Sequence, residues 1–176
     1  RRCCFLHIKS STPGLLAGIP GEKLQAVRFA EELAFEKFEY YTMANHGQWS
    51  IVAVPSIAWA KKVFPELEEQ AALDALWDAV LAGVRIGGNR DAVAEWQAHI
   101  TRLAENSRKL NTYHFQALHF RNGIGTDLTV GLAKGHIWEG GSSRADNGAV
   151  FVPNMPTEEV FTAPDKCHVN GRVYAT

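Results

Sequence analysis

Two adjacent carboxylates, Glu158 and Glu159, lie in the segment NMPTEEVFTAP, residues 154–164. The rest of the segment has the composition of a β-strand, in which carboxylates are disfavoured. Because successive side chains of a strand point to opposite faces, only one of the two can face inward. If that residue is Glu159, it shares a face with Thr157 and Phe161. An inward carboxylate must be neutralised by a cation, by a base or by protonation.

The carboxylate pair also has a simpler interpretation, in which both side chains lie on a solvated strand edge or cap a turn. Hard divalent ions and zinc both accept carboxylate oxygen, so Glu159 is a candidate metal ligand. The local sequence leaves both interpretations open.

The other residues that could do chemistry form no recognisable set. The histidines show neither the H-x-x-x-H spacing of a helical metal pair nor the H-x-H spacing of a strand pair. The glycine-rich segments GGNR and NGIGTD lack the strand–loop–helix context of a phosphate site, and no G-x-S-x-G motif is present. The sequence therefore assigns no catalytic residue and leaves the substrate-binding residues unknown. The histidines are His7, His46, His99, His114, His119, His136 and His168.

The three cysteines, Cys3, Cys4 and Cys167, predict neither a disulfide framework nor a zinc site. Their number is odd, two of them are adjacent, and no C-x-x-C motif occurs. Reduced thiols are typical of a cytoplasmic protein, so we expect that location.

The overall charge and composition disfavour two classes of partner. The net charge is −1, with 46% hydrophobic and 21% charged residues. A nucleic-acid or anionic-membrane partner would favour a basic surface, and no stretch approaches the ~20 apolar residues that span a bilayer. We therefore expect neither nucleic acid nor membrane as a partner.

The elements that must position these residues change in kind along the chain. Up to residue 112, apolar runs alternate with apolar residues at three- and four-residue steps, which predicts an α/β region. The predicted elements are strand 3–8, helix 24–41, strand 49–54, a short helix up to Phe64, a longer helix after Pro65 and a helix through Trp96 to Leu110.

From Tyr113 onward, short alternating or apolar runs are separated by glycines, which indicates antiparallel strands and hairpins. The runs are 114–120, 126–133 and 148–153. We therefore predict two domains, 1–112 and 113–176, with a β-rich second domain whose core alone is marginal at that size. The chain starts with Arg1-Arg2 instead of Met and ends in the strand-like NGRVYAT, so we expect an incomplete chain.

The segment NMPTEEVFTAPD closely resembles the signature of the M29 (thermophilic) metallo-aminopeptidases. Two further segments are similar to this family: VPSIAWAKKVFPELEEQAALDALWDAV, and FQALHFRNGIGTDLTVGLAKGHIWEGG at residues 115–141. The similarity extends over most of the chain from about residue 49, whereas the first 48 residues match less recognisably.

The resemblance implies a metal-dependent aminopeptidase that releases N-terminal residues from peptides and acts as a homodimer. It implies two divalent metal ions (zinc, cobalt, magnesium or manganese), with Glu159 as one ligand and the other ligands beyond this chain. The fold it implies is an α/β N-terminal region followed by the start of a β-rich (α+β) catalytic domain.

With one ligand, the 176 residues should be inactive alone. The alternative is a truncated, non-catalytic product that keeps only a dimerisation or peptide-binding surface.

Overall fold

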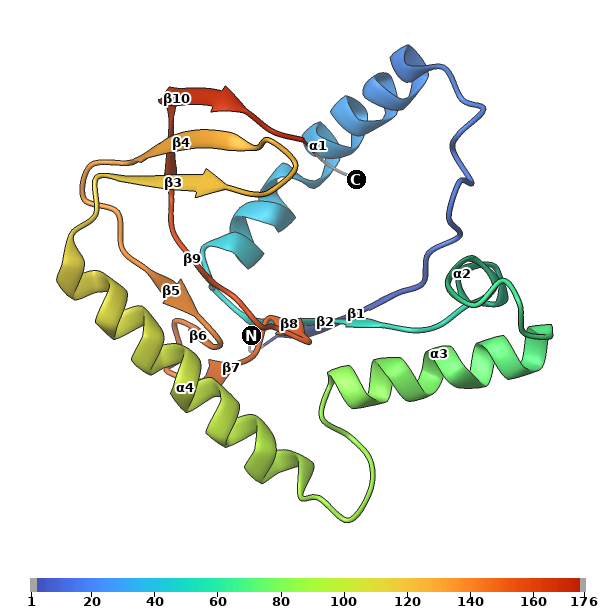
Figure 1. Cartoon of the computed structure of the whole chain (residues 1–176). Coiled ribbons are helices and arrows are strands. Elements are labelled where there is room, and N and C mark those ends of the chain that lie inside the picture. The colour runs from blue at the N-terminus through green and yellow to red at the C-terminus, as the bar shows by residue number, and fades with distance from the viewer. Residues whose placement is uncertain (1–2, 175–176) are drawn as a thin grey trace. The chain divides into compact units, whose positions relative to one another are not determined.

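The computed structural model describes residues 3–174, and Figure 1 shows the order of their elements. Among these residues, no helix is both long and apolar enough to cross a membrane. The helices are α1 (Gly21–Met43), α2 (Ile57–Val63), α3 (Glu69–Gly83) and α4 (Ala92–Tyr113). The strands are β1 (Cys4–Lys9), β2 (Gln48–Ala53), β3 (Ala117–Arg121), β4 (Asp127–Leu132), β5 (Glu139–Gly140), β6 (Ser143–Arg144), β7 (Val150–Phe151), β8 (Asn154–Met155), β9 (Val160–Phe161) and β10 (Pro164–Arg172).

The described residues form two compact units, and neither unit is continuous in sequence. The first unit contains the residues up to Trp96 together with Ser142–Thr157, and the second contains Gln97–Gly141 together with the residues from Glu158 onward. The chain therefore passes between the units inside α4, after Gly141 and after Thr157. The predicted domain boundary near residue 112 stays a prediction, although the change in sequence character at Tyr113 coincides with the end of α4.

A parallel sheet of order β1-β2-β8 organises the first unit. Strands β1 and β2 pair from Cys4↔Gln48 to Lys9↔Ala53, and α1 connects them, which gives the βαβ unit that a parallel pair requires. Phe5 of β1 contacts Phe38 of α1 in an edge-to-face arrangement with ring centroids 5.1 Å apart. The α/β organisation expected for this region is confirmed.

Helices α2 and α3 form a small apolar core in the same unit. Ala60 of α2 packs against Ala72 and Leu76 of α3, and all three side chains are buried. The Ser56 hydroxyl accepts a hydrogen bond from the Trp59 N–H (3.2 Å) and caps the N-terminus of α2. The apolar stripe predicted after Pro65 is therefore core, as its helical spacing indicated.

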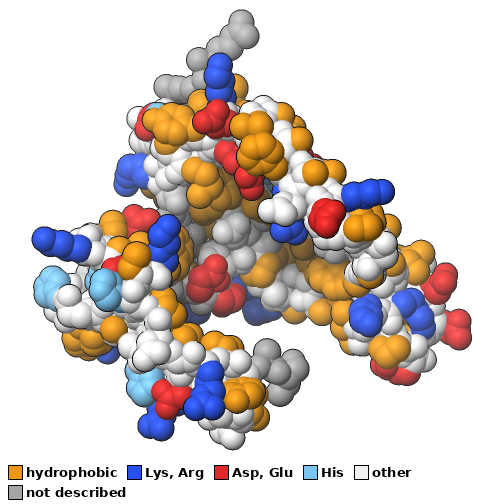
Figure 2. Space-filling view, turned by 90° about the horizontal axis from the view of Figure 1, so that it is seen from above, with side chains coloured by type: hydrophobic (Ala, Val, Ile, Leu, Met, Phe, Trp, Pro, Cys, Tyr) orange, Lys and Arg blue, Asp and Glu red, His pale blue; other side chains and the backbone are white. Residues whose placement is uncertain are grey.

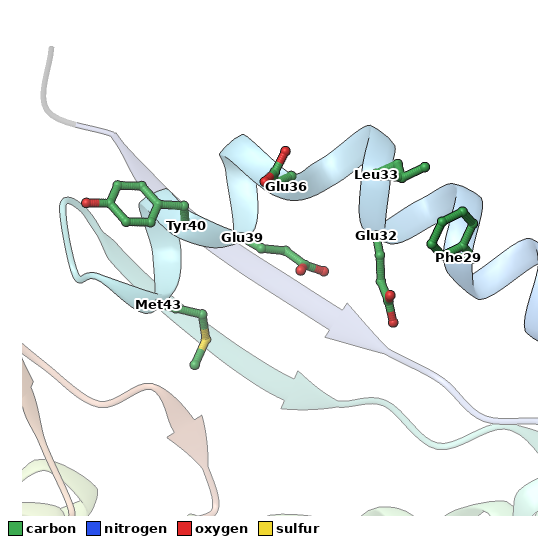
Figure 3. Close-up of a pocket in the computed structure, with 7 residues that line it drawn as sticks. All are labelled: Phe29, Glu32, Leu33, Glu36, Glu39, Tyr40 and Met43. Atoms are coloured by element: carbon green, nitrogen blue, oxygen red, sulfur yellow. The ribbon is translucent and has the colours of Figure 1, made fainter.

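Helix α1 carries large apolar side chains that stay exposed among the described residues, namely Phe29, Leu33, Tyr40 and Met43. Although its apolar residues have helical spacing, none of its side chains is buried in this part of the chain. Side chains from this helix alone line an open groove of about 460 Å³. Figure 3 shows how these side chains project from the helix. On the face of the molecule drawn in Figure 2, exposed apolar side chains are intermixed with charged ones. The groove is lined by Phe29, Glu32, Leu33, Glu36, Glu39, Tyr40 and Met43.

An antiparallel sheet of order β10-β4-β3 organises the second unit. Strands β3 and β4 form a hairpin from Ala117↔Gly131 to Arg121↔Asp127, and the side chain of Asn122 accepts the N–H of Thr126 (2.9 Å) in its turn. This pairing confirms the antiparallel strands expected after Tyr113. Alternating runs bounded by glycines favour this geometry.

Candidate functional site

The segment that carries Glu158 and Glu159 is not a continuous strand. Strand β8 ends at Met155 and β9 begins at Val160, so the two carboxylates lie between short strands. Both glutamates are exposed, whereas Thr157 is 7% exposed. Of the two interpretations that the sequence left open, the inward-facing Glu159 in an extended strand is not observed, because strict alternation of side chains holds only where the backbone stays extended.

Strand β5 fixes the backbone of the segment on its C-terminal side. Gly140 of β5 pairs with Val160 of β9, and Glu139 pairs with Phe161. A Cβ atom placed on Gly140 would lie 2.7 Å from the carbonyl oxygen of Glu159 and 2.9 Å from Cγ1 of Val160. Position 140 therefore requires glycine, because only a residue without a side chain permits this close backbone approach.

Helix α4 contacts residues next to β5, which pairs with β9. The Asn111 side chain accepts the N–H of Trp138 (2.8 Å) and donates to the Trp138 carbonyl (3.0 Å). Leu103 lies against the next glycine, since a Cβ atom on Gly141 would be 3.2 Å from its Cβ. The residues from Trp138 to Gly141 therefore run along α4, which positions β5 to pair with β9.

Glu158 points to a buried histidine on α4. Its Oε2 atom lies 3.5 Å from Nε2 of His99, whose side chain is 3% exposed. On the opposite side of the imidazole, Nη2 of Arg102 lies 2.8 Å from Nδ1. Because a guanidinium group can only donate, Nδ1 accepts and Nε2 carries the hydrogen that faces Glu158.

The carboxylate of Glu159 contacts a neighbouring backbone group and no charged side chain among the described residues. Its Oε2 atom accepts the N–H of Glu158 at 3.3 Å, which is at the long end for a hydrogen bond. Within residues 3–174 no other polar partner of this carboxylate is found. Of the two glutamates, Glu159 is therefore the one whose oxygens are the more available to a ligand.

The described residues could supply one ligand to a metal ion, Glu159, but not a complete metal site. An exposed carboxylate is a suitable oxygen donor for a divalent ion. However, no group of three or more His, Cys, Asp or Glu side chains in the described part of the chain could hold such an ion. A complete set of ligands would therefore need side chains from outside residues 3–174.

Several other histidines pair with carboxylates instead of gathering at one site. His119 lies 2.7 Å from Asp127 across the β3–β4 hairpin, and His168 lies 2.6 Å from Asp165 in β10. The hydrogen bond with His119 lowers the pKa of Asp127, as does the charge of Arg121. These contacts stabilise local structure and define no reaction centre.

The hydrogen bonds of Asp165 have the same effect. They come from His168 and from the backbone N–H of Cys167, and they lower its pKa. His46 likewise contacts Asp146 at 2.5 Å in the first unit.

The cavities do not reveal a better candidate. The groove along α1 lies in the first unit and is lined by carboxylates and apolar side chains, without a nucleophile–base pair. A cavity of about 180 Å³ in the second unit is lined by residues that include His114, Lys134, His136 and Trp138. His136 donates a hydrogen bond from Nδ1 to the Ala133 carbonyl (2.9 Å), and no carboxylate lines this cavity.

Glu159 stays a predicted metal ligand, and the contact between His99 and Glu158 was not predicted from the sequence. The predicted apolar face of α4 contains Trp96, Ile100 and Leu103, and His99 belongs to the same face by its helical position. A histidine on the buried face of a helix signals a polar partner, because burial of an unpaired imidazole is unfavourable. The identity of that partner, Glu158, depended on the tertiary structure.

Comparisons with known proteins agree over the whole chain. The family model described as thermophilic metalloprotease (M29) matches residues 1–176. Aminopeptidase T of Thermus thermophilus is 40% identical over 171 residues, which cover 97% of this chain and 41% of that protein. Aminopeptidase PepS of Streptococcus thermophilus is 40% identical over 177 residues, with 100% of this chain and 42% of the relative covered.

The structural comparison gives the same result. The solved structure of wild-type AmpT from Thermus thermophilus superimposes with a TM-score of 0.83 at 38% identity. The match covers 97% of this chain and 41% of that structure. The chain thus spans about two fifths of the length of the relatives that it matches.

Proposed function

The chain belongs to the M29 family of thermophilic metalloproteases, and we propose that the full-length protein is a metal-dependent aminopeptidase. Its reaction would be hydrolysis of the first peptide bond of a peptide substrate. The observation that supports this proposal most directly is the exposed Glu159 carboxylate, held in a defined backbone position between β5 and α4.

The residues of this chain would contribute to the reaction by binding and orientation. Glu159 would supply one carboxylate ligand, and the pairing of Gly140 with Val160 would hold its backbone. When bound, a pair of divalent ions (zinc, cobalt, magnesium or manganese) supplies Lewis-acid chemistry, which lowers the pKa of a water molecule and polarises a carbonyl group. The remaining ligands, the general base and the site for the substrate's amino group would lie outside the described residues.

Three further parts of the proposal rest on family membership. We propose that the protein acts on peptides, forms a homodimer and works in the cytoplasm. We also propose that the 176 residues alone are inactive, because no group of three metal-binding side chains occurs among residues 3–174. The alternative, a non-catalytic product that retains only a dimerisation or peptide-binding surface, predicts no turnover by the full-length protein.

Hydrolysis of a leucyl chromogenic amide by the full-length protein tests the proposal. We expect turnover that a chelator abolishes and that added Zn²⁺ or Co²⁺ restores. Glu159→Gln should lower kcat/KM by about 100-fold or more, because loss of a charged ligand weakens metal binding and misplaces the metal ion. The matched control is Glu105→Gln on the exposed side of α4, which should leave turnover unchanged.

Two results would contradict the proposal. Turnover that resists the chelator would exclude a metal-dependent reaction. Equal turnover by Glu159→Gln and Glu105→Gln would remove Glu159 from the site.

A further inference from the structure

We propose that His99 is a positioning residue for the metal ligand: it holds the Glu158 side chain against α4 and thereby sets the place of the Glu159 carboxylate. This inference rests on the proposed function, since it takes Glu159 as a ligand. His99 itself does not contact the metal ion in this proposal.

The imidazole of His99 is buried, and its two nitrogens have polar neighbours that fix its orientation. The side chain is 3% exposed, and burial of a polar ring is unfavourable unless its nitrogens are paired. Both nitrogens have polar neighbours, Arg102 at 2.8 Å on Nδ1 and Glu158 at 3.5 Å on Nε2. The donor from Arg102 fixes the tautomer, so the N–H of Nε2 faces the Glu158 carboxylate.

The contact of Glu158 with His99 restrains the backbone at the next residue, Glu159. The chain at Glu159 is held on one side by the Glu158 side chain at α4 and on the other by the pairing of Val160 with Gly140. Between these two fixed points lies a single residue. Its backbone is therefore restrained, and only its own side-chain torsions remain to orient the carboxylate.

The two supports of Glu159 come from neighbouring parts of one helix. Arg102 and His99 stand three residues apart on α4, where side chains meet on one surface. Leu103, adjacent to Arg102, contacts Gly141, which follows the β5 residue Gly140. Helix α4 therefore fixes both the Glu158 side chain and β5, and it defines the geometry of the segment between them.

The size of the expected effect follows from what such partners do in metal sites. Groups that orient a ligand without touching the metal typically change metal affinity by about 10- to 100-fold when they are removed. A purely structural role for His99 would instead lower the stability of the metal-free protein and leave the metal affinity of the folded protein unchanged.

Zn²⁺ titration of the metal-free, full-length protein, in competition with a chromophoric chelator, separates these roles. We expect His99→Leu, which keeps bulk but removes both nitrogens, to weaken Zn²⁺ binding about 10- to 100-fold. His99→Gln retains an N–H donor and an acceptor, and it should recover most of the affinity. At saturating Zn²⁺, KM for a leucyl amide should be the same in the parent and in both variants.

Two reference variants keep the failure of this inference distinct from the failure of the proposed function. Glu159→Gln should weaken Zn²⁺ binding at least as much as His99→Leu, and Glu105→Gln should leave it unchanged. If Glu159→Gln weakens binding and His99→Leu does not, His99 has no positioning role and the proposed function stands. If neither variant weakens binding, both proposals are overturned.

A further variant covers the case in which His99→Leu does not fold. Glu158→Ala removes the same contact from its exposed end, because the Glu158 side chain is 57% exposed. It should weaken Zn²⁺ binding about as much as His99→Leu. Unchanged Zn²⁺ affinity in Glu158→Ala would overturn the inference.

Discussion

Replacement of Asn111 by alanine should loosen the segment that supports the candidate site. The Asn111 side chain forms two hydrogen bonds with the backbone of Trp138, at 2.8 and 3.0 Å. Its removal leaves an N–H and a carbonyl group of a largely buried residue without this partner, since Trp138 is 9% exposed. We expect a local cost of roughly 2–3 kcal/mol for the pair, from about 1–1.5 kcal/mol for each hydrogen bond.

Hydrogen exchange of the Trp138 amide in the full-length protein measures this cost locally, without an assumption of two-state unfolding. A loss of roughly 2–3 kcal/mol corresponds to exchange that is about 30- to 150-fold faster. The matched control is Asn106→Ala, at an exposed position of the same helix. It should leave the exchange of Trp138 unchanged and stabilise α4 slightly, because alanine is the better helix former.

Equal exchange of the Trp138 amide in the two variants would contradict this expectation. It would mean that the amide is protected by the packing of Trp138 against α4 and not by the Asn111 side chain. The role of Asn111 in the position of β5 would then have to be abandoned.

Two further predictions concern a glycine and an acidic group. Gly140→Ala should destabilise the protein by about 1–3 kcal/mol and lower peptidase turnover, because its Cβ would meet the Glu159 carbonyl oxygen at 2.7 Å; Gly83→Ala, with nothing within 4 Å, should be neutral or stabilising. Melting temperatures and kcat/KM check this, and equal melting temperatures would contradict it. The pKa of Asp165 is lowered in the folded state by its hydrogen bonds with His168 and the Cys167 N–H. Its stabilising contribution is therefore fully present above the unfolded value near 3.8 and is lost as pH falls through the lower folded value. Asp165→Asn should flatten the acid limb of the stability profile between these values, and an unchanged limb would show that Asp165 does not contribute.

The sequence predicted the elements that carry strong periodicity. Strands β1 and β2 lie within a residue of their predicted limits, since each forms a continuous apolar run that a turn signal ends. Helix α3 follows its apolar stripe, with Leu76 buried in the core. These predictions succeeded because the apolar pattern of each element is long enough to be recognised.

The short strands around the candidate site could not be predicted in the same way. Strands β5 and β9 have two residues each, which is too few for a period to be recognised. The pairing of Gly140 with Val160 and the contact of His99 with Glu158 connect residues that are distant in sequence. The resemblance predicts Glu159 as a ligand, whereas the contacts around it emerge only from the folded chain.

The pairing of β2 with β8 has a consequence for synthesis of the protein in the cell. Ile51 pairs with Asn154, so the edge of β2 has no partner until the ribosome has added roughly 100 more residues. At about 5–20 residues per second, this interval lasts on the order of 5–20 s. The nascent chain meanwhile exposes the unpaired edge of an apolar strand, WSIVAV, which is a template for aggregation. The nascent protein therefore depends on slow, late closure of this sheet, and chaperones that bind extended apolar segments would act in this window.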